Sequence, residues 1–291
     1  PMKHPLRRGL LYLGFQGLRG LVPALPLRSA RAIGRGLGLA AYGLLGAHRR
    51  LALRHLDFAL GGSLAPRERQ RTARRMFVNL GQTAVEWLAL PKLSTDRLTR
   101  LVSIDGADHL REALAPGHGA IALTAHFGNW ELIPLALRGL GCEGGVLARP
   151  LRYPEYEPFL TAARHARGVA TFARGSLKEA AAALRANRVV GMLPDQDMDS
   201  LEGIFVEFFG HPAYTPVGPA ALSVMTAAPI VPCFLIREGA RFRLVIEPPL
   251  SAPRLADRTQ AIAALTRAWS AVVESYIRRY PDHWVWMHRR W

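Results

Sequence analysis

The segment Gly119-Ala120-Ile121-Ala122-Leu123-Thr124-Ala125-His126-Phe127-Gly128-Asn129-Trp130-Glu131 contains the features that decide the fold of this chain. Ala120–Ala125 is a short apolar run after a glycine, and its length predicts a buried strand. Gly128 and Asn129 permit a tight turn, and Glu131 begins a stretch that is expected to be helical up to Leu140. A buried strand that leads through a turn into a helix is typical of α/β proteins.

The same alternation of strands and helices continues downstream of this segment. Short apolar runs predict further strands at Gly145–Ala148, Val169–Phe172, Val189–Leu193, Ile230–Ile236 and Phe242–Ile246. Apolar positions at helical spacing predict helices at Pro66–Leu90, Tyr156–Arg167, Leu177–Ala186, Val217–Ala227 and Asp257–Tyr280. The sequence therefore predicts an α/β fold with a mixed, mostly parallel sheet flanked by helices on both faces.

The N-terminal part differs in composition from the rest of the chain. It is apolar, rich in glycine and dotted with arginines, and no acidic residue precedes Asp57. Leu10–Leu27 is close in length to a membrane span, but it contains Arg19 and two prolines. We therefore expect a helical membrane-associating segment at residues 1–60 that lies at the membrane interface, and an α/β domain at residues 61–291. A membrane span and an ordinary amphipathic helix packed on the domain remain open.

The charge of the chain limits the classes of partner. The 291 residues include 38 Lys and Arg against 22 Asp and Glu, which gives a formal net charge of +16. Nearly all of the basic residues are arginines, whose planar guanidinium binds two phosphate oxygens at once. A positive electrostatic field of this strength implies a polyanionic partner, either nucleic acid or anionic lipid. We expect anionic membrane lipid and no nucleic acid, because the basic residues are mixed with apolar stretches; a basic nucleic-acid-binding protein is the alternative outside enzymes.

The His126–Glu131 spacing points to acid–base chemistry. The strand presents His126 at its carboxyl end, where catalytic groups of open α/β sheets gather. A strand-turn-helix of this length can fold Glu131 back toward the imidazole, and a carboxylate on one ring nitrogen leaves the other nitrogen basic. The motif contains no serine or cysteine, so a covalent intermediate is not expected, and a metal site is not expected without a His-Glu-x-x-His pattern. The spacing alone equally allows a helix-capping Glu131 beside a structural His126.

Further motifs follow this one in a fixed order. They include Arg149-Pro150, the segment 191–197 with Pro194-Asp195-Gln196-Asp197, the segment 203–210, and the tail Trp284–Arg290. Together with Thr124–Glu131 they resemble, over most of the chain, the late acyltransferases of lipid A biosynthesis, the lauroyl/myristoyl transferases of the lysophospholipid acyltransferase superfamily. The resemblance implies a glycerolipid-acyltransferase-like fold at the cytoplasmic face of the cell inner membrane.

The resemblance also implies a reaction. A fatty acyl chain would pass from an acyl thioester of acyl carrier protein or coenzyme A to a hydroxyl of a lipid A precursor or related glycolipid, without a cofactor. His126 is implied as the general base and Glu131 as the carboxylate that orients it. Some relatives of the family acylate mannosyl phospholipids or other glycolipids, so a different lipid acceptor remains open.

Other residues acquire expected roles from the same resemblance. Arg149, Arg164, Asp195 and Asn129 are expected to bind substrate or support the site, and Arg149 or Arg164 is expected to hold a phosphate of the donor or acceptor. A solvated helix face is the alternative for Arg164. A salt bridge that supports the site is the alternative for Asp195.

The aromatic residues near the end of the chain are candidates for contact with the acyl chain or the membrane. Phe205, Phe208 and Phe209 are candidates for the acyl groove or a membrane-facing rim, with the core of a β-hairpin as the alternative. The tryptophans of the tail, Trp284, Trp286 and Trp291, are expected at the membrane interface or at the edge of the sheet.

Overall fold

Strand β2 (Ala120–Leu123) lies at the centre of a seven-stranded sheet in the computed structural model, which describes residues 5–90, 95–148, 153–173, 177–196 and 202–291. The strand order is β1-β9-β8-β2-β5-β3-β4. The other strands are β1 (Val102–Asp105), β3 (Gly144–Ala148), β4 (Val169–Ala173), β5 (Val189–Met192), β8 (Ile230–Glu238) and β9 (Arg241–Ile246). All neighbours are parallel except β8 and β9, so the predicted α/β fold with a mostly parallel sheet is confirmed.

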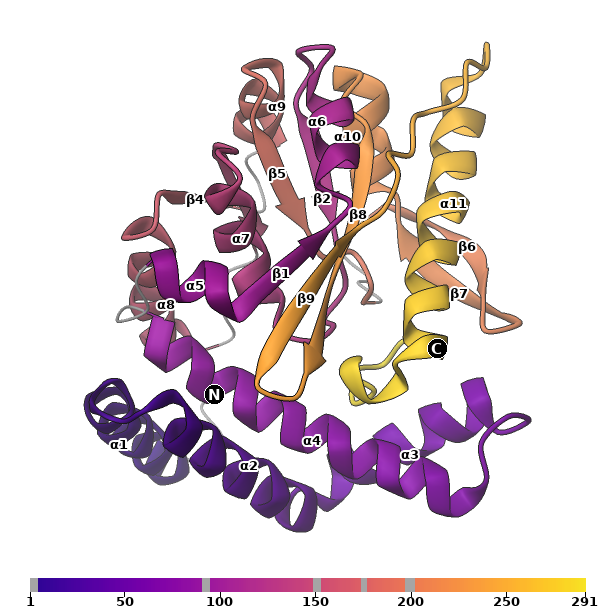
Figure 1. Cartoon of the computed structure of the whole chain (residues 1–291). Coiled ribbons are helices and arrows are strands. Elements are labelled where there is room, and N and C mark those ends of the chain that lie inside the picture. The colour runs from indigo at the N-terminus through magenta and orange to yellow at the C-terminus, as the bar shows by residue number, and fades with distance from the viewer. Residues whose placement is uncertain (1–4, 91–94, 149–152, 174–176, 197–201) are drawn as a thin grey trace.

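Helices cover both faces of this sheet (Figure 1). Successive side chains of β2 point to opposite faces, so Ile121 and Leu123 belong to one hydrophobic cluster and Ala120 and Ala122 to the other. The first cluster includes residues of α9 (Leu177–Arg185), α10 (Gly218–Thr226) and α11 (Arg258–Arg279). The second includes residues of α6 (Ala107–Leu114) and α7 (Ile133–Gly139). Because both faces are covered, β2 is apolar throughout instead of alternating.

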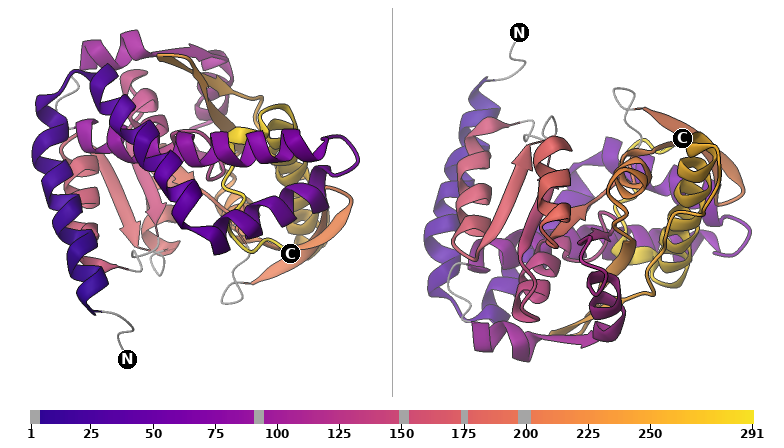
Figure 2. Two further views of the ribbon diagram at one scale, coloured as in Figure 1. Left: turned by 90° about the horizontal axis from the view of Figure 1, so that it is seen from below. Right: turned by 90° about the horizontal axis from the view of Figure 1, so that it is seen from above.

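Four N-terminal helices lie together below the sheet (Figure 1, and Figure 2 in the view from below). They are α1 (Pro5–Leu21), α2 (Leu27–Leu44), α3 (Gly46–Leu60) and α4 (Pro66–Ala89), with the short 3-10 turn η1 (Val22–Ala24) between α1 and α2. Helix α2 packs closely on α4, because Gly34 and Gly38 face Gly81 without side chains. A Cβ at Gly38 would lie 2.3 Å from the carbonyl oxygen of Phe77, so a larger residue there would force the helices apart.

Helix α3 also packs against the main core, since Leu56 and Leu60 belong to the same cluster as Phe234 of β8. None of the helices in the described ranges combines the length and the apolar character that crossing a membrane requires. The division of the chain at residue 60 and the interfacial role of its N-terminal part stay predictions.

The helix expected at Glu131–Leu140 is interrupted in the structure. A 3-10 turn, η3 (Trp130–Leu132), comes first, and α7 begins at Ile133 with Pro134 in its first turn. Proline lacks the backbone N–H that would continue a preceding helix, which accounts for the break. The predicted helix near Tyr156–Arg167 corresponds to η4 (Pro154–Tyr156) and α8 (Glu157–His165).

Several elements have no counterpart in the expected set. These are α5 (Thr95–Leu101), α6, β1 and the 3-10 turn η5 (Pro281–His283). The two-stranded hairpin of β6 (Gly203–Phe208) and β7 (His211–Pro216) was expected only as an alternative. Strand β1 has the sequence Val-Ser-Ile-Asp, which is too short and too polar to produce an apolar run.

Candidate active site

The turn after β2 is held in place by the C-terminal tail and by the neighbouring strand. Phe127 forms an isolated bridge with Trp284, and the N–H of Gly128 donates to the carbonyl oxygen of His283 at 2.9 Å. Gly128 has φ +60°, and a Cβ there would lie 2.0 Å from the carbonyl oxygen of Leu235. Only glycine fits both the conformation and the space, so this position fixes how the chain passes from His126 to Glu131.

His126 and Asp195 meet at the carboxyl edge of the sheet. His126 follows β2 and Asp195 follows β5, and these strands are neighbours and parallel. The His126 Nδ1 lies 2.8 Å from Asp195 Oδ1, and the backbone N–H of His126 donates to Oδ2 at 3.0 Å. Trp284 Nε1–H also donates to Oδ2, at 2.9 Å. Asp195 is therefore fixed by three donors from two separate parts of the chain.

The surroundings of Asp195 keep it ionised. Burial alone would raise the pKa of this carboxyl, but the charge of His126 and the hydrogen bonds from His126 and Trp284 hold it at about 2. An ionised Asp195 accepts the proton of Nδ1, so the lone pair of His126 lies on Nε2. The His126 side chain is 26% exposed, and Nε2 has no hydrogen-bond partner among the described residues. This is the geometry of a general base that is open to a substrate proton.

Glu131 does not contact the imidazole, so the predicted hydrogen bond between Glu131 and His126 is wrong in this structure. Its two carboxylate oxygens accept from Arg164 instead, at 3.0 Å from Nε and 2.6 Å from Nη2. The 3-10 turn after Asn129 directs Glu131 toward α8 and away from the ring. The carboxylate that contacts His126 is Asp195, and the alternative of a salt bridge at Asp195 that supports the site agrees with this geometry.

Arg164 is buried, so the alternative of a solvated helix face is wrong. The ion pair leaves its side chain 10% exposed, and its Nη1 is buried without a hydrogen-bond partner among the described residues. Because Glu131 already accepts from Nε and Nη2, a phosphate held by Arg164 would have to compete with this ion pair. Arg149 lies outside the described residues.

Breaking the ion pair from one side should cost stability. We expect Glu131→Gln to lower the free energy of unfolding by about 3–5 kcal/mol, because it leaves a buried guanidinium without its carboxylate. Arg164→Met added to Glu131→Gln should recover most of that loss. Urea denaturation of Glu131→Gln, Arg164→Met and the double variant measures these free energies. If the losses of the two single variants add up in the double variant, the ion pair contributes nothing to the free energy of unfolding.

Two further residues that contact this site were not expected from the sequence. Glu86 of α4 accepts a hydrogen bond from the Nδ2 of Asn129, and both side chains are buried. His288 has its ring centroid 5.8 Å from that of His126. His288 lies in the tail motif Trp284–Arg290, so a sequence motif did point to this part of the chain. Glu86 lies in an ordinary amphipathic-helix pattern, which gives no indication of a role in the site.

The phenylalanines of the hairpin have different environments. Phe208 and Phe209 are buried in the main core, so the hairpin-core alternative is correct for these two. Phe205 is 68% exposed and packs on Tyr214. Trp284 and Trp286 are likewise buried, so they do not lie at a membrane interface; Trp284 instead closes the site over Asp195.

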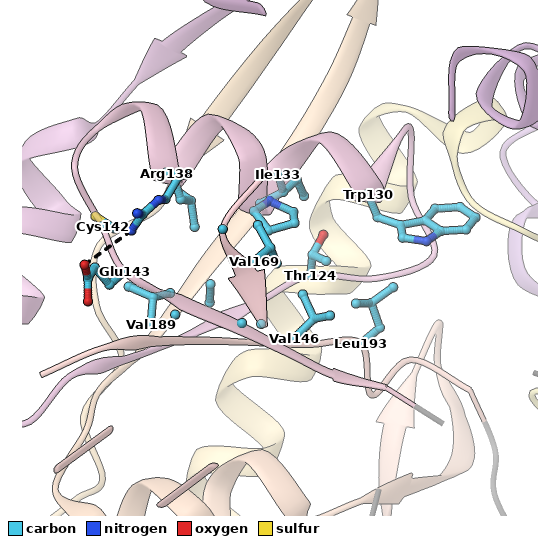
Figure 3. Close-up of a pocket in the computed structure, with 17 residues that line it drawn as sticks. Thr124, Trp130, Ile133, Arg138, Cys142, Glu143, Val146, Val169, Val189 and Leu193 are labelled. Atoms are coloured by element: carbon cyan, nitrogen blue, oxygen red, sulfur yellow. Dashed lines mark ion pairs between the residues drawn. The ribbon is translucent and has the colours of Figure 1, made fainter. Parts of the chain in front are cut away.

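An apolar pocket runs between α7 and the sheet (Figure 3). Trp130, which packs edge-on against the His126 ring at 5.2 Å, lies at one end together with Thr124 and Leu193. The Arg138–Glu143 ion pair lies at the other end. Small residues form much of the sheet side, including Ala122 of β2 and Gly191 of β5, which are paired across the two strands.

Comparison with known proteins identifies the class. The family model of the bacterial lipid A biosynthesis acyltransferases matches residues 2–291. The lipid A biosynthesis lauroyltransferase of Escherichia coli K12 is 29% identical over 99% of this chain and 92% of that protein. The lipid A biosynthesis palmitoleoyltransferase of the same organism is 26% identical over 99% of this chain and 92% of that protein. A phosphatidylinositol mannoside acyltransferase of Mycobacterium tuberculosis is 31% identical over 71% of this chain and 66% of that protein.

The α/β fold and the matched sequences define an acyltransferase that acts on a lipid acceptor. The chain belongs to the bacterial lipid A biosynthesis acyltransferase family, and the match extends over nearly its whole length. The resemblance inferred from the sequence motifs is therefore confirmed.

Proposed function

We propose that this enzyme moves a fatty acyl chain from a thioester of acyl carrier protein or coenzyme A to a hydroxyl of a lipid A precursor, with His126 as the general base. The observation that carries the proposal is the His126–Asp195 pair, which directs an unshared Nε2 into the site. Neither a metal nor a covalent acyl-enzyme is part of the proposed reaction.

In the proposed reaction, Nε2 of His126 removes the proton of the acceptor hydroxyl as the oxygen attacks the thioester carbonyl carbon. The negative charge of Asp195 stabilises the imidazolium that forms. The tetrahedral intermediate collapses with cleavage of the carbon–sulfur bond, and the thiolate that leaves takes the proton back from the imidazolium. His126 and Asp195 end in the states in which they began, and the reaction needs no reactant besides the acyl thioester and the acceptor hydroxyl.

The lipid A acceptor is supported by the two Escherichia coli relatives, which match 99% of the chain and bear lipid A biosynthesis names. A mannosyl phospholipid is the second candidate, because the mycobacterial relative is 31% identical. Mass spectrometry of lipids from cells with and without the gene tests both. An added acyl chain on lipid A supports the first acceptor, an added chain on a mannosyl phospholipid supports the second, and unchanged lipids refute both.

The acyl chain of the donor would lie in the pocket between α7 and the sheet. The pocket is lined mainly by apolar side chains, and Trp130 at one end of it packs against the His126 ring, so the carbonyl could remain near Nε2 while the chain extends away from it (Figure 3). Its volume is about 40 Å³ in this structure, so a bound chain must move α7 away from the sheet. This placement replaces the groove expected at Phe208 and Phe209, which are core residues.

Narrowing this pocket should change the preferred donor. A Cβ at Gly191 would lie 3.1 Å from Cγ1 of Val146, so Gly191→Val needs only a small shift, and valine is favoured in strands. We expect the variant to prefer shorter acyl chains than the wild type, measured as kcat/KM for acyl thioesters of increasing length. Val190→Leu, on the opposite face of the same strand, is the matched control and should keep the wild-type preference. An unchanged preference in Gly191→Val would exclude this pocket.

We further propose that α1 lies on the cytoplasmic face of the inner membrane. Leu10, Leu11 and Leu13 are 70%, 60% and 68% exposed, and Arg19 of the same helix is exposed too. Apolar side chains beside a basic residue suit the boundary between acyl chains and anionic headgroups.

Vesicle sedimentation tests this contact. The wild-type protein should sediment with vesicles that contain phosphatidylglycerol. Leu10→Ser combined with Leu13→Ser should weaken this binding at least tenfold, because two leucine side chains that would be buried in the membrane are lost. Leu140→Ser removes a leucine that is 41% exposed elsewhere and should bind as the wild type does. Equal binding by all three proteins would contradict the role of α1.

A further inference from the structure

A buried carboxylate of α4 lies directly behind the turn that carries His126 and Glu131. Glu86 is 2% exposed and stands near the end of α4. Its Oε1 accepts from Arg31 Nε at 2.5 Å and from Arg237 Nη1 at 2.6 Å, and its Oε2 accepts from Arg237 Nη2 at 2.8 Å and from Asn129 Nδ2 at 2.9 Å. Four donors from α2, β8 and the turn after β2 therefore converge on one side chain.

The two arginines hold the carboxylate in one orientation. Arg237 binds it through two parallel hydrogen bonds, which is the most directional form of this interaction. The guanidinium groups of Arg31 and Arg237 both lie over the ring of Phe242, at 5.3 Å and 4.7 Å from its centroid. Arg31 also donates to the carbonyl oxygen of Ala240. With its position set by these contacts, Glu86 can act as a fixed acceptor for Asn129.

Asn129 joins this acceptor to the catalytic turn. It is completely buried and stands between His126 and Glu131, at the start of the 3-10 turn that contains Glu131. Asparagine commonly caps such a turn with its own side chain, but here the amide makes no cap and points to Glu86 instead. A second contact comes from the same face of α4, where Thr83 Oγ1 donates to the carbonyl oxygen of Gly128 at 3.4 Å.

We propose that Glu86 is a positioning residue for acyl transfer: held by Arg31 and Arg237, its carboxylate fixes Asn129 and thereby the turn that places His126 and Glu131. The role rests on the acyl-transfer function proposed above. Glu86 touches neither the substrate nor the imidazole, so its effect reaches the reaction only through the geometry of the turn. Misplacement of a catalytic group by about 1 Å can lower a rate by roughly 100-fold, which makes such support measurable.

The test compares Asn129→Ala, Glu86→Gln and the double variant. Asn129→Ala removes the link but leaves the Glu86–Arg31–Arg237 ion pairs intact, so it folds even if Glu86→Gln does not. Ser223→Ala is the control, because it deletes a buried hydrogen bond, to the carbonyl oxygen of Ala228, on an element that does not carry the site. Two quantities are measured: kcat and KM with lauroyl-acyl carrier protein and a lipid A precursor, and amide hydrogen exchange of the peptide that covers residues 123–133.

We expect Asn129→Ala to exchange faster in this peptide and to lower kcat by about 10- to 100-fold, with KM for the donor changed by less than about threefold. The double variant should resemble Glu86→Gln alone, because both changes break the same link. Ser223→Ala should leave exchange of the peptide and kcat unchanged.

Unchanged exchange in Asn129→Ala overturns the positioning role, and so does a double variant whose kcat loss is the product of the two single losses. Amide hydrogen exchange of this peptide can be measured whether or not the protein transfers acyl chains. If the wild type transfers no acyl chain to either lipid, faster exchange of this peptide in both Asn129→Ala and Glu86→Gln still supports the role of Glu86 in holding the turn, while the proposed function fails separately.

Discussion

Replacement of His126 by alanine should lower acyl transfer by roughly 10²–10⁴-fold, the range that a positioned general base contributes. Nε2 is the ring nitrogen without a partner among the described residues, so it is the atom of His126 that is open to the proton of the acceptor hydroxyl. The side chain is 26% exposed, and its removal leaves only a small gap, so the fold should persist. The measurement is kcat with a fatty acyl thioester and a lipid A precursor.

His118→Ala is a suitable control, because His118 is exposed and lies before β2, at the opposite end of the strand from the site. It should retain the wild-type kcat. A His126→Ala protein that also transfers acyl chains at the wild-type rate would remove His126 from the mechanism.

Asp195→Asn should lower kcat by about 10³–10⁴-fold even though the side chain keeps its shape. Three N–H groups donate to the carboxylate, two of them from His126 and one from Trp284. An amide offers one oxygen and places an NH₂ group where the second oxygen stood. When that NH₂ faces Nδ1, the imidazole must carry its proton on Nε2, and the base is lost; the same change behind the histidine of a serine protease lowers kcat about 10⁴-fold.

The same substitution should remove a pH-dependent part of the stability. The pKa of Asp195 is about 2 in the folded protein, below the usual value of 3.8, so its ionisation stabilises the fold above about pH 4, and that stability is lost as the pH falls toward 2. The contribution is of the order of 2 kcal/mol. Urea denaturation at pH 6 and pH 3 should show the difference between wild type and Asp195→Asn shrinking at the lower pH. A constant difference would contradict the depressed pKa.

The central part of the fold could be predicted because apolar runs of strand length are local signals. β2, β5 and β8 are buried on both faces, so each appears as a continuous apolar run. β1 could not be found in the same way, since half of its four residues are polar and its place is decided by pairing with β9, far along the chain. The break before α7 depends on how Pro134 meets the preceding turn, which spacing alone does not resolve.

The residues of the candidate site could be predicted, but not which of them contact each other. His126, Glu131, Arg164 and Asp195 were all expected in the site, yet the spacing of His126 and Glu131 suggested that they pair with each other. The sheet instead brings His126 to Asp195 across two parallel strands, and α8 brings Arg164 to Glu131. Because these contacts depend on the order of the strands and on the packing of a helix, no local sequence pattern predicts them. The same holds more strongly for Glu86, because its contacts with Asn129, Arg31 and Arg237 come from packing and no sequence pattern distinguishes it from other helical glutamates.

The contact between Trp284 and Asp195 has a consequence for how the enzyme is made. The two residues are 89 positions apart, and Trp284 also pairs with Phe127 at the catalytic turn. A ribosome adds roughly 5–20 residues each second, so the strands that carry His126 and Asp195 leave it several seconds before the tryptophan does. During that interval the nascent chain can fold the strands that carry both residues, but the carboxylate lacks its third donor. The geometry around Asp195 is thus completed only late in synthesis, when the C-terminal tail packs against the turn after β2.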